Sequence, residues 1–436
     1  MEFYSTNNKA LRVSLKEAVQ SGLAKDGGLF MPVEIPRLPS PVLNALHTLS
    51  FKEIAFEMAR LFTDKEVPEH ILQSVIEDAF NFDAPLHRLQ DDLFVLELFH
   101  GPTLAFKDFG ARFMARLMAY FSRHEDKEIT ILVATSGDTG SAVASGFFEQ
   151  PGIRVVLLYP SGMVSEIQEK QLTTIGGNVT ALEVLGDFDD CQRLVKQAFT
   201  DPELRRNLTL SSANSINIAR LLPQSFYYAY AVRQLSGKAG PVVVSVPSGN
   251  LGNLTAGVFA QKMGIPIQKF VSAMNVNDVY LHYLQEGRFN PREVTATLSN
   301  AMDVGNPSNF FRLAELFRGD WQAMRQVIHG QSFTDDDTRK AIQLIYEKFD
   351  YLMDPHGAVG YLALMKTVEE QRLRGWQKIT LETAHPAKFK SVVEACIRKE
   401  IPPVQRLQNA LEGKKQAVKM SGNFEMFKEF LLEFSD

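Results

Sequence analysis

Apolar positions along the chain follow a helical period first and a strand period later. Within the first 85 residues they recur at the spacing of an amphipathic helix, as in the stripe Phe51, Ala55, Met58, Ala59 and Phe62, which we expect to be core. From residue 94 onward, short runs of β-branched and aliphatic residues alternate with helical patterns, and such runs are typical of strands buried on both faces. The predicted strands are 94–98, 129–134, 154–159, 179–184, 242–246 and 270–274, with another at residue 379.

This alternation predicts the α/β class. Helices between successive strands imply parallel βαβ units, so we expect two open, mostly parallel twisted sheets flanked by helices, behind a mainly helical N-terminal region. The pattern stops near residue 235 and restarts at 241, which divides the chain into three segments: 1–85, 86–235 and 236–436. In open parallel sheets, ligands bind beyond the carboxyl ends of the strands. Polar loops at those ends are therefore expected to meet in one cleft between two α/β lobes.

The segment HGPTLAFKDFGARFMARLM, residues 100–118, places Lys107 where a predicted amphipathic helix begins. Phe109, Phe113 and Leu117 recur at helical spacing and should face a core. The positive end of the helix dipole repels a cation at this position and favours the neutral amine. A neutral lysine is a nucleophile that can form a Schiff base with an aldehyde such as pyridoxal phosphate. The alternative is a solvated surface lysine, the common state of this residue type.

The loop SGNLGN, residues 248–253, lies between a predicted buried strand and a helical stretch, 254–263. This order is typical of phosphate sites, because N–H groups converge at a helix start and the helix dipole favours an anion. Gly249 and Gly252 leave room for close backbone approach. The loop has neither the Lys-Ser/Thr ending of a P-loop nor the three-glycine dinucleotide pattern, so it indicates one small phosphate. The alternative is a purely structural Gly-Asn turn.

Two further strand ends carry polar groups. The loop TSGDTG, residues 135–140, precedes a helix of small residues, and its hydroxyl and N–H groups suit a carboxylate. Its alternative is an ordinary helix cap by Ser136 or Thr139. Thr383, at the end of the last strand, can hydrogen-bond a pyridine nitrogen without protonating it, or it can merely cap backbone. His385, before a proline suited to a first helical position, is expected to be a turn residue.

Together the four segments resemble the threonine synthase family, pyridoxal-phosphate enzymes of the tryptophan-synthase-β structural group (fold type II). The likeness covers essentially the whole chain. Each motif alone is moderately specific, and their joint occurrence in this order is highly specific. The motifs are SGLAKDGGLFMP (21–32), HGPTLAFKDFG (100–110), TSGDTG (135–140), NSINIAR (214–220), SVPSGNLGN (245–253), NVND (275–278), LSNAMDVGNPSN (298–309) and TAHPAKF (383–389).

The resemblance implies a cofactor, pyridoxal 5'-phosphate, and a reaction. O-phospho-L-homoserine and water would give L-threonine and phosphate, the last step of threonine biosynthesis, by γ-elimination and β-addition of water. Lys107 would be the Schiff-base lysine and a base, and Thr383 would contact the ring nitrogen. The cofactor phosphate would lie on Ser248, Gly249, Asn250, Leu251, Gly252 and Asn253. The substrate carboxylate would lie on Ser136, Gly137, Asp138 and Thr139, and the substrate phosphate near Asn214, Asn217 and Arg220.

Some of these roles have open alternatives. Arg220 suits a bidentate grip on phosphate, but a surface ion pair explains it equally well. Asp138 is out of place beside an anionic carboxylate, so we expect it to orient its loop through N–H groups. Lys16 and Lys388 are weaker candidate cations for the substrate.

Composition narrows the choice of partners. The formal net charge of −5, from 46 basic and 51 acidic residues, argues against a nucleic-acid-binding surface. The two cysteines, Cys191 and Cys396, predict no disulfide framework and are expected to be reduced and buried in a cytoplasmic chain. No stretch resembles a signal peptide or the roughly 20 apolar residues of a membrane helix. We therefore expect a cytoplasmic monomer or homodimer that acts on a small molecule, with no metal site.

Two rival functions remain at this level. One is a phospho-lyase of the same fold that loses phosphate and ends at a keto acid without adding water. The other is a non-catalytic binding protein that keeps the fold. The presence of Lys107 argues against the second rival, and the match at the substrate loops argues against the first.

Overall fold

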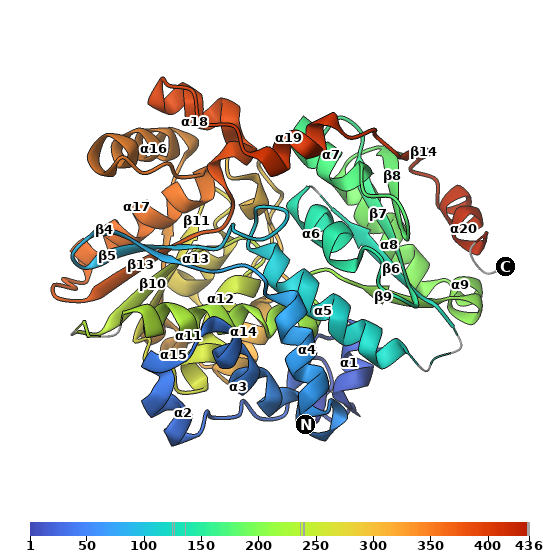
Figure 1. Ribbon diagram of the computed structural model, residues 1–436, viewed down its shortest axis with the longest axis horizontal. Helices are drawn as coiled ribbons and strands as arrows, with labels where there is room; N and C mark the ends of the chain where they lie inside the picture. Colours follow the sequence, from blue (N-terminus) through green and yellow to red (C-terminus); the bar gives the residue numbers. More distant parts are fainter. Residues whose placement is uncertain (124, 126, 136, 236, 239, 434–436) are drawn as a thin grey trace. The chain divides into compact units, whose positions relative to one another are not determined.

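The computed structural model describes residues 1–123, 125, 127–135, 137–235, 237–238 and 240–433 (Figure 1). The chain forms two compact units, each assembled from separate stretches. Unit 1 comprises Met1, Met31–Phe106 and Leu221–Pro402, and unit 2 comprises Glu2–Phe30, Lys107–Arg220 and Pro403–Asp436. The three consecutive segments expected from the sequence follow a different division and stay a prediction.

Unit 1 contains a six-stranded sheet in the order β12-β11-β10-β13-β5-β4, of which β4, β5, β13 and β10 can be followed side by side in Figure 1. Its inner pairs are parallel, and only β4 runs antiparallel to its neighbour β5. Every residue of β10 and β13 is buried, which explains the nearly continuous apolar run of β10, whereas β13 buries polar residues such as Thr380 and Glu382 as well. The strands are β4 (Leu86–Gln90), β5 (Leu93–Glu97), β10 (Val242–Pro247), β11 (Lys269–Met274), β12 (Ile328–Ser332) and β13 (Gln377–Glu382).

Helices pack on this sheet, and the N-terminal elements α3 and η1 pack against helix α11. Helix α17 packs on β10, β11, β12 and β13. The predicted stripe on α3 is buried as expected, and Ser50 and Glu53 form a capping box at its start. The elements are α2 (Ser40–Ala45), η1 (Leu46–Thr48), α3 (Phe51–Thr63), η2 (Asp64–Glu66), α4 (Glu69–Ala79), α11 (Gln224–Gln234), α12 (Gly252–Lys262), α13 (Val279–Glu286), η3 (Asn300–Met302), α14 (Phe310–Leu316), α15 (Trp321–Val327), α16 (Asp335–Phe349), α17 (Pro355–Glu370), η4 (Pro386–Phe389) and α18 (Lys390–Ile397).

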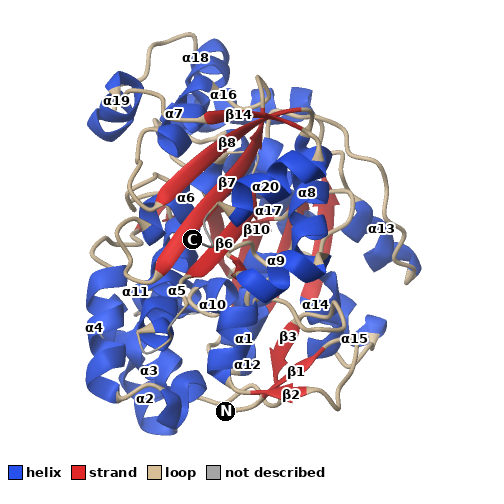
Figure 2. Ribbon diagram, turned by 90° about the vertical axis from the view of Figure 1, so that its right-hand side faces the viewer, coloured by secondary structure: helices blue, strands red, loops and turns tan. Residues whose placement is uncertain are grey.

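Unit 2 contains a five-stranded parallel sheet in the order β14-β8-β7-β6-β9, with β8, β7 and β6 visible side by side in Figure 2. The strands are β6 (Ile129–Ala134), β7 (Ile153–Pro160), β8 (Val179–Leu185), β9 (Thr209–Ser212) and β14 (Val418–Ser421). Continuing βαβ units from 94–98 to 129–134 were expected, and this expectation was wrong. Strand β5 pairs with β13 in the other sheet. An apolar strand that is buried on both faces fits into any parallel sheet, so the sequence pattern does not specify which strand pairs with it.

Two helices of unit 2 approach each other closely. A Cβ on Gly146 of α6 would lie 3.1 Å from the carbonyl carbon of Ala111 on α5, so a larger residue would require the two helices to move apart by a few tenths of an ångström. Arg116 Nη1 also donates to Gly146 O at 2.7 Å. The remaining elements are α1 (Leu15–Ser21), α5 (Lys107–Ser122), α6 (Asp138–Phe147), α7 (Glu166–Thr173), α8 (Phe188–Thr200), α9 (Pro202–Asn207), α10 (Ile218–Leu221), α19 (Gln405–Glu412), α20 (Phe424–Leu432), β1 (Phe3–Ser5), β2 (Arg12–Val13) and β3 (Phe30–Pro32).

Within the stretches that the structure describes, no helix combines the length and the apolar character needed to cross a membrane. Cys191 is buried and Cys396 is half-buried, and both are free thiols.

Candidate active site

Three of the predicted site segments follow neighbouring strands of unit 1. Strands β10, β13 and β5 are adjacent and parallel, so their carboxyl ends lie at one edge of the sheet. The loop after β5 is fastened to the loop after β13: Phe106 N–H donates to Thr383 O at 2.8 Å, and His385 N–H donates to Leu104 O at 3.0 Å. Since Lys107 directly follows Phe106, chain connectivity keeps this lysine near the strand end that carries Thr383.

Thr383 has the properties expected of a ring-nitrogen partner. Its side chain is buried, and its hydroxyl makes no hydrogen bond to any other described residue. His385, two residues later, caps η4 by accepting the Ala387 N–H at 3.1 Å. Burial lowers the pKa of His385 to about 4, so its ring is neutral. The prediction that His385 is a turn residue is confirmed.

The loop 248–253 is a rigid turn ahead of α12. Ser248 N–H donates to Ala273 O, and Ser248 Oγ donates to Val246 O. Leu251 adopts the left-handed conformation with φ 59°, and α12 begins at Gly252. The first N–H groups of a helix have no partner inside the helix, so this turn presents donors to an anion. The predicted order of strand, glycine-rich loop and helix start is confirmed.

Asn253 gives a direct test of whether this loop fits a phosphate. Its Oδ1 accepts hydrogen bonds from the hydroxyls of Tyr227 and Tyr228, both at 2.7 Å, which fixes the orientation of the amide. Its Nδ2 is buried and has no partner among the described residues. An unsatisfied buried donor costs about 1–3 kcal/mol, so its presence indicates an acceptor from a ligand. The cradle therefore fits the phosphate of pyridoxal phosphate.

Gly249 packs against the segment that contains η3. A Cβ there would lie 2.8 Å from both Ala301 O and Met302 Cα, which is too close for any real contact. Gly249→Ala is therefore expected to lower the free energy of unfolding by about 1–3 kcal/mol, as overpacking does, and also to weaken cofactor binding. Denaturant unfolding of the cofactor-free protein measures the first effect and fluorescence titration with pyridoxal phosphate measures the second. An unchanged affinity would mean that the loop is only a turn.

Unit 2 holds Lys107 at the first position of α5, as predicted. Arg220 packs beside the next turn of this helix, because a Cβ on Gly110 would lie 2.7 Å from Arg220 O. The Arg220 guanidinium is buried and donates to Ala213 O, and burial lowers its pKa to about 10 despite the nearby Asp108 carboxylate. The surface-ion-pair alternative for Arg220 was wrong, because only 3 % of the residue is exposed.

The loop 135–140 is organised by a hydroxyl that the sequence analysis did not single out. Thr135 Oγ1 accepts the N–H groups of Gly137 and Gly140, at 3.0 and 2.8 Å. Asp138, the first residue of α6, accepts a hydrogen bond from Gln168 Nε2 at 3.2 Å. The predicted residue Ser136 lies outside the described residues. A carboxylate site on Gly137, Asp138 and Thr139 stays a prediction.

Asn217 has a structural use that the motif did not reveal. Its Nδ2 donates to Val19 O at 2.9 Å and to Ser212 O at 3.2 Å, and its Oδ1 accepts the Ala219 N–H. These bonds occupy both amide hydrogens. Asn214 is half-buried, and its N–H is bonded to Ser212 Oγ at 3.3 Å. Asn214 is therefore the better placed of the two asparagines to contact a ligand.

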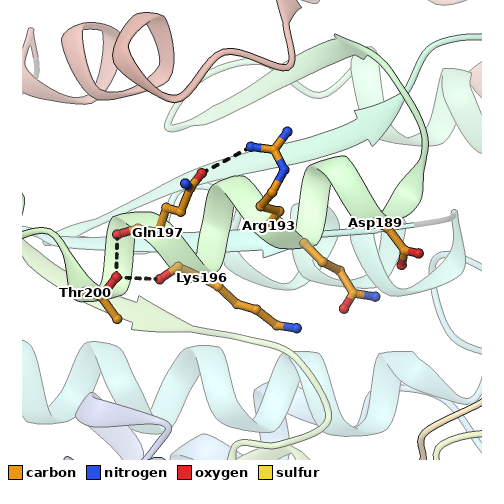
Figure 3. Close-up of a pocket in the computed structure, with 6 residues that line it drawn as sticks. Asp189, Arg193, Lys196, Gln197 and Thr200 are labelled. Carbon is orange, nitrogen blue, oxygen red and sulfur yellow. Dashed lines mark hydrogen bonds between the residues drawn. The ribbon is translucent and has the colours of Figure 1, made fainter. Parts of the chain in front are cut away.

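A shallow surface hollow lies along α8 in unit 2 (Figure 3). All its lining side chains come from this single helix, and they bond among themselves, as Arg193 Nη1 does to Gln197 Oε1 at 3.2 Å (Figure 3). None of the predicted site residues lines it. We assign it no function.

Comparison with known proteins agrees with this chemistry. Three family models match: "Pyridoxal-phosphate dependent enzyme" over residues 77–382, "Threonine synthase N terminus" over 2–80 and "Threonine synthase, C-terminal" over 357–431. Threonine synthase of Haemophilus influenzae is 43 % identical over 434 residues, covering 99 % of this chain and 100 % of its own.

Solved structures extend the match to three dimensions. The crystal structure of threonine synthase from Escherichia coli aligns with a TM-score of 0.92 and 41 % identity, covering all of both chains. The PLP-bound threonine synthase from Brucella melitensis aligns with a TM-score of 0.92 and 34 % identity, over 100 % of this chain and 99 % of that one. The chain therefore belongs to the threonine synthase family of pyridoxal-phosphate-dependent lyases.

Proposed function

We propose that this protein converts O-phospho-L-homoserine and water to L-threonine and phosphate, with Lys107, the loop 248–253 and Thr383 acting on one cofactor. The observation that carries the residue assignment is the hydrogen bond from Phe106 N–H to Thr383 O, because Lys107 is the next residue in the chain. The unsatisfied Asn253 Nδ2 in the phosphate cradle supports it independently.

The protein groups have separate tasks in this proposal. Lys107 would hold the cofactor covalently, and its free amine would be the group that moves protons at the substrate's Cα, Cβ and Cγ. The bound cofactor supplies an electron sink for the carbanion. The loop 248–253 fixes the cofactor phosphate through N–H groups and Asn253 Nδ2. Thr383 would donate its hydroxyl hydrogen to the ring nitrogen and, as a neutral group, would not protonate it.

The substrate side rests on unit 2. Ser136, Gly137, Asp138 and Thr139 are proposed to hold the substrate carboxylate. Asn214 and Arg220 are proposed on the phosphate side, with Asn217 holding their segment in place. A buried arginine beside the helix that starts at Lys107 supports this assignment, because a desolvated guanidinium binds phosphate more strongly than an exposed one.

The defining experiment is incubation of the holoenzyme with O-phospho-L-homoserine and assay of three products. We expect threonine and free phosphate in equal amounts. 2-Oxobutyrate as the main organic product would instead identify a phospho-lyase that adds no water.

Thr383→Val tests the ring contact, because valine keeps nearly the same shape without the hydroxyl. We expect the variant to retain bound cofactor and to show a kcat about ten- to a hundredfold lower, as a lost hydrogen bond of about 1–3 kcal/mol in the transition state implies. Absorbance of the bound cofactor and steady-state kinetics provide the measurement. Parental kcat with an unshifted spectrum would exclude a contact between Thr383 and the ring.

We further propose a cytoplasmic enzyme that is a monomer or homodimer. The two free thiols suit a reducing compartment, where disulfides do not persist. Sedimentation velocity at several concentrations would determine the oligomeric state.

A further inference from the structure

Strand β13 ends in a fully buried carboxyl group, Glu382, directly before Thr383. Its Oε1 accepts the Asp354 N–H at 2.6 Å. Its Oε2 is pressed against α17, since a Cβ on Gly357 would lie 1.6 Å from it. This atom receives no hydrogen bond from the described residues. An ionised carboxylate in this position would be desolvated and incompletely satisfied, which proteins avoid.

A second carboxyl group, that of Asp354, lies within hydrogen-bonding contact of Glu382. Asp354 is also fully buried and caps α17. Its Oδ1 accepts the His356 N–H at 2.6 Å and faces His356 Nδ1 at the same distance, and its Oδ2 accepts the Ala384 N–H at 3.3 Å. Both oxygens of Asp354 therefore face hydrogen-bond donors, which suits an ionised carboxylate, whereas the Glu382 carboxyl group receives one hydrogen bond. Two adjacent carboxyl groups bond to each other only when one carries a proton.

The pair connects two parts of the proposed cofactor site. Asp354 binds the N–H of Ala384, the residue after Thr383. His356 Nε2 accepts the Ala301 N–H at 3.2 Å, so in the neutral ring the hydrogen is on Nδ1. Nδ1 then donates this hydrogen to Asp354 Oδ1. Ala301 lies against Gly249 of the phosphate loop. A chain of hydrogen bonds therefore runs from Ala384, next to Thr383, to Ala301, which packs against the phosphate loop.

We propose that Glu382 is a neutral carboxylic acid that donates its proton to Asp354, and that this acid–carboxylate pair is a positioning unit for Thr383 and, through His356, for the phosphate loop. The positioning role rests on the proposed contact between Thr383 and the cofactor ring. The shared proton does not depend on it.

The surrounding charges agree with this assignment. Burial, followed by the Asp354 charge, raises the pKa of Glu382 well above its ordinary value. On the neighbouring strand, Glu97 is paired in register with Glu382. Burial opposes ionisation of Glu97, but hydrogen bonds from His100 and Tyr351 outweigh it and lower its pKa. The other titratable groups around the pair are His100 in the loop after β5, Tyr351 in the loop before α17, His356 on α17, and His385 and Lys388 in the segment after β13.

Infrared spectroscopy of the cofactor-free protein at pH 7 tests the proton directly. We expect a carboxylic-acid C=O band in the parent that is absent in Glu382→Gln, and an unchanged band in the matched control Glu183→Gln. Glu183 is a buried carboxylate of unit 2 whose pKa lies below its ordinary value, because the effect of burial is outweighed by bonds from Lys415 and Ser161. Absence of the band from the parent would overturn the proposal. If Glu382→Gln does not fold, Asp354→Asn serves instead, because loss of the acceptor shifts the acid band.

Stability provides a second readout on the same cofactor-free protein. Glu382 keeps its proton in the folded state and releases it on unfolding above the ordinary glutamate pKa of about 4.3. Because the pKa of Glu382 is higher in the folded state, its contribution to the free energy of unfolding is complete below the unfolded-state pKa. This contribution is lost as the pH rises toward the folded-state pKa. Between pH 5 and 7 the unfolding constant of the parent should rise about tenfold per pH unit relative to Glu382→Gln. The ratio for Glu183→Gln should stay flat, and a flat ratio for Glu382→Gln would contradict the shared proton.

A double-mutant cycle in the holoenzyme tests positioning. Glu382→Gln can still donate to Asp354, whereas Glu382→Met has similar length and no donor. We expect Glu382→Met to lower kcat about ten- to a hundredfold, with rescue of most of that loss in Glu382→Gln. Thr383→Val should lower kcat further in the Gln background and have little further effect in the Met background.

The outcomes separate this inference from the proposed function. If Thr383→Val lowers kcat by the same factor in the parent and in both Glu382 variants, the positioning role is overturned and the proposed function stays intact. Parental kcat in Thr383→Val overturns the proposed ring contact itself and the positioning role with it, while the infrared band reports the shared proton in either case.

Discussion

Lys107→Ala is expected to give a folded protein that cannot attach pyridoxal phosphate covalently and has almost no activity. Lys107 is the first residue of α5 and is only half-buried, so its replacement by alanine, a good helix former, removes little core volume. Its amine is proposed as both the covalent anchor and the proton carrier. Loss of a positioned acid–base group alone lowers kcat by about 10²- to 10⁴-fold, and loss of the anchor adds to this effect. The measurements are kcat with O-phospho-L-homoserine and absorbance of the bound cofactor.

A lysine that has no proposed role provides the control for this experiment. Lys196 is exposed on α8 of the same unit, and Lys196→Ala should leave the spectrum and kcat at parental values. In the parent, borohydride reduction should fix the cofactor to Lys107, as peptide mapping would show. A label on any other lysine would end this assignment, whatever the kinetics of Lys107→Ala.

Asn253→Asp is expected to weaken the binding of pyridoxal phosphate strongly while keeping the shape of the cradle. The hydroxyls of Tyr227 and Tyr228 can still donate to one oxygen of the new side chain. The Nδ2 donor is replaced by an anionic oxygen that repels the phosphate. A hydrogen bond to a charged group contributes about 1.5–3 kcal/mol, so the dissociation constant should rise about ten- to a hundredfold, and repulsion should increase it further.

Cofactor titration of the apoenzyme measures this effect, with unfolding of the apoenzyme to monitor the fold. Asn44→Asp makes the same chemical change at an exposed position of α2 in the same unit, and it should leave the affinity unaltered. If Asn253→Asp binds the cofactor as tightly as the parent, the buried amide does not face the phosphate, and the fit of the cradle rests on backbone groups alone.

The limits of several helices and strands were predictable because residues close in the sequence determine them. The run at 129–134 forms β6 with the expected limits, and α5 begins at Lys107. Helix α6 begins at Asp138, three residues earlier than the small-residue stretch suggested, because Thr135 Oγ1 supplies its N-terminal donors with a partner. Side-chain periodicity and turn residues act over one or two turns of chain, so one sequence displays them.

Residue type, in contrast, did not distinguish ligand contacts from structural ones. Asn217 and Asn253 occupy similar polar motifs, yet both amide hydrogens of the first bind backbone carbonyls and those of the second have no partner among the described residues. Arg220 was equally compatible with the surface and the interior. Glu382 and Asp354 drew no attention, because an isolated acidic residue in a sequence is expected to be solvated. Each distinction depends on neighbours that are remote in sequence.

The sequence by itself determined seven strands of the two main sheets, the start of α5 and the order of the motif loops, and thereby the α/β class and the membership of the threonine synthase family; it did not reveal β4, β9, β12 or β14. Only the tertiary structure decided that β5 pairs with β13, that Phe106 is fastened to Thr383, and that Glu382 meets Asp354. The physical reason is the separation along the sequence of the residues that interact. Hydrophobic period and helix-start chemistry act between residues a few positions apart, whereas strand pairing and burial bring together groups that are tens to hundreds of residues apart. The environment of a charge or a donor, and therefore its chemistry, exists only after that assembly.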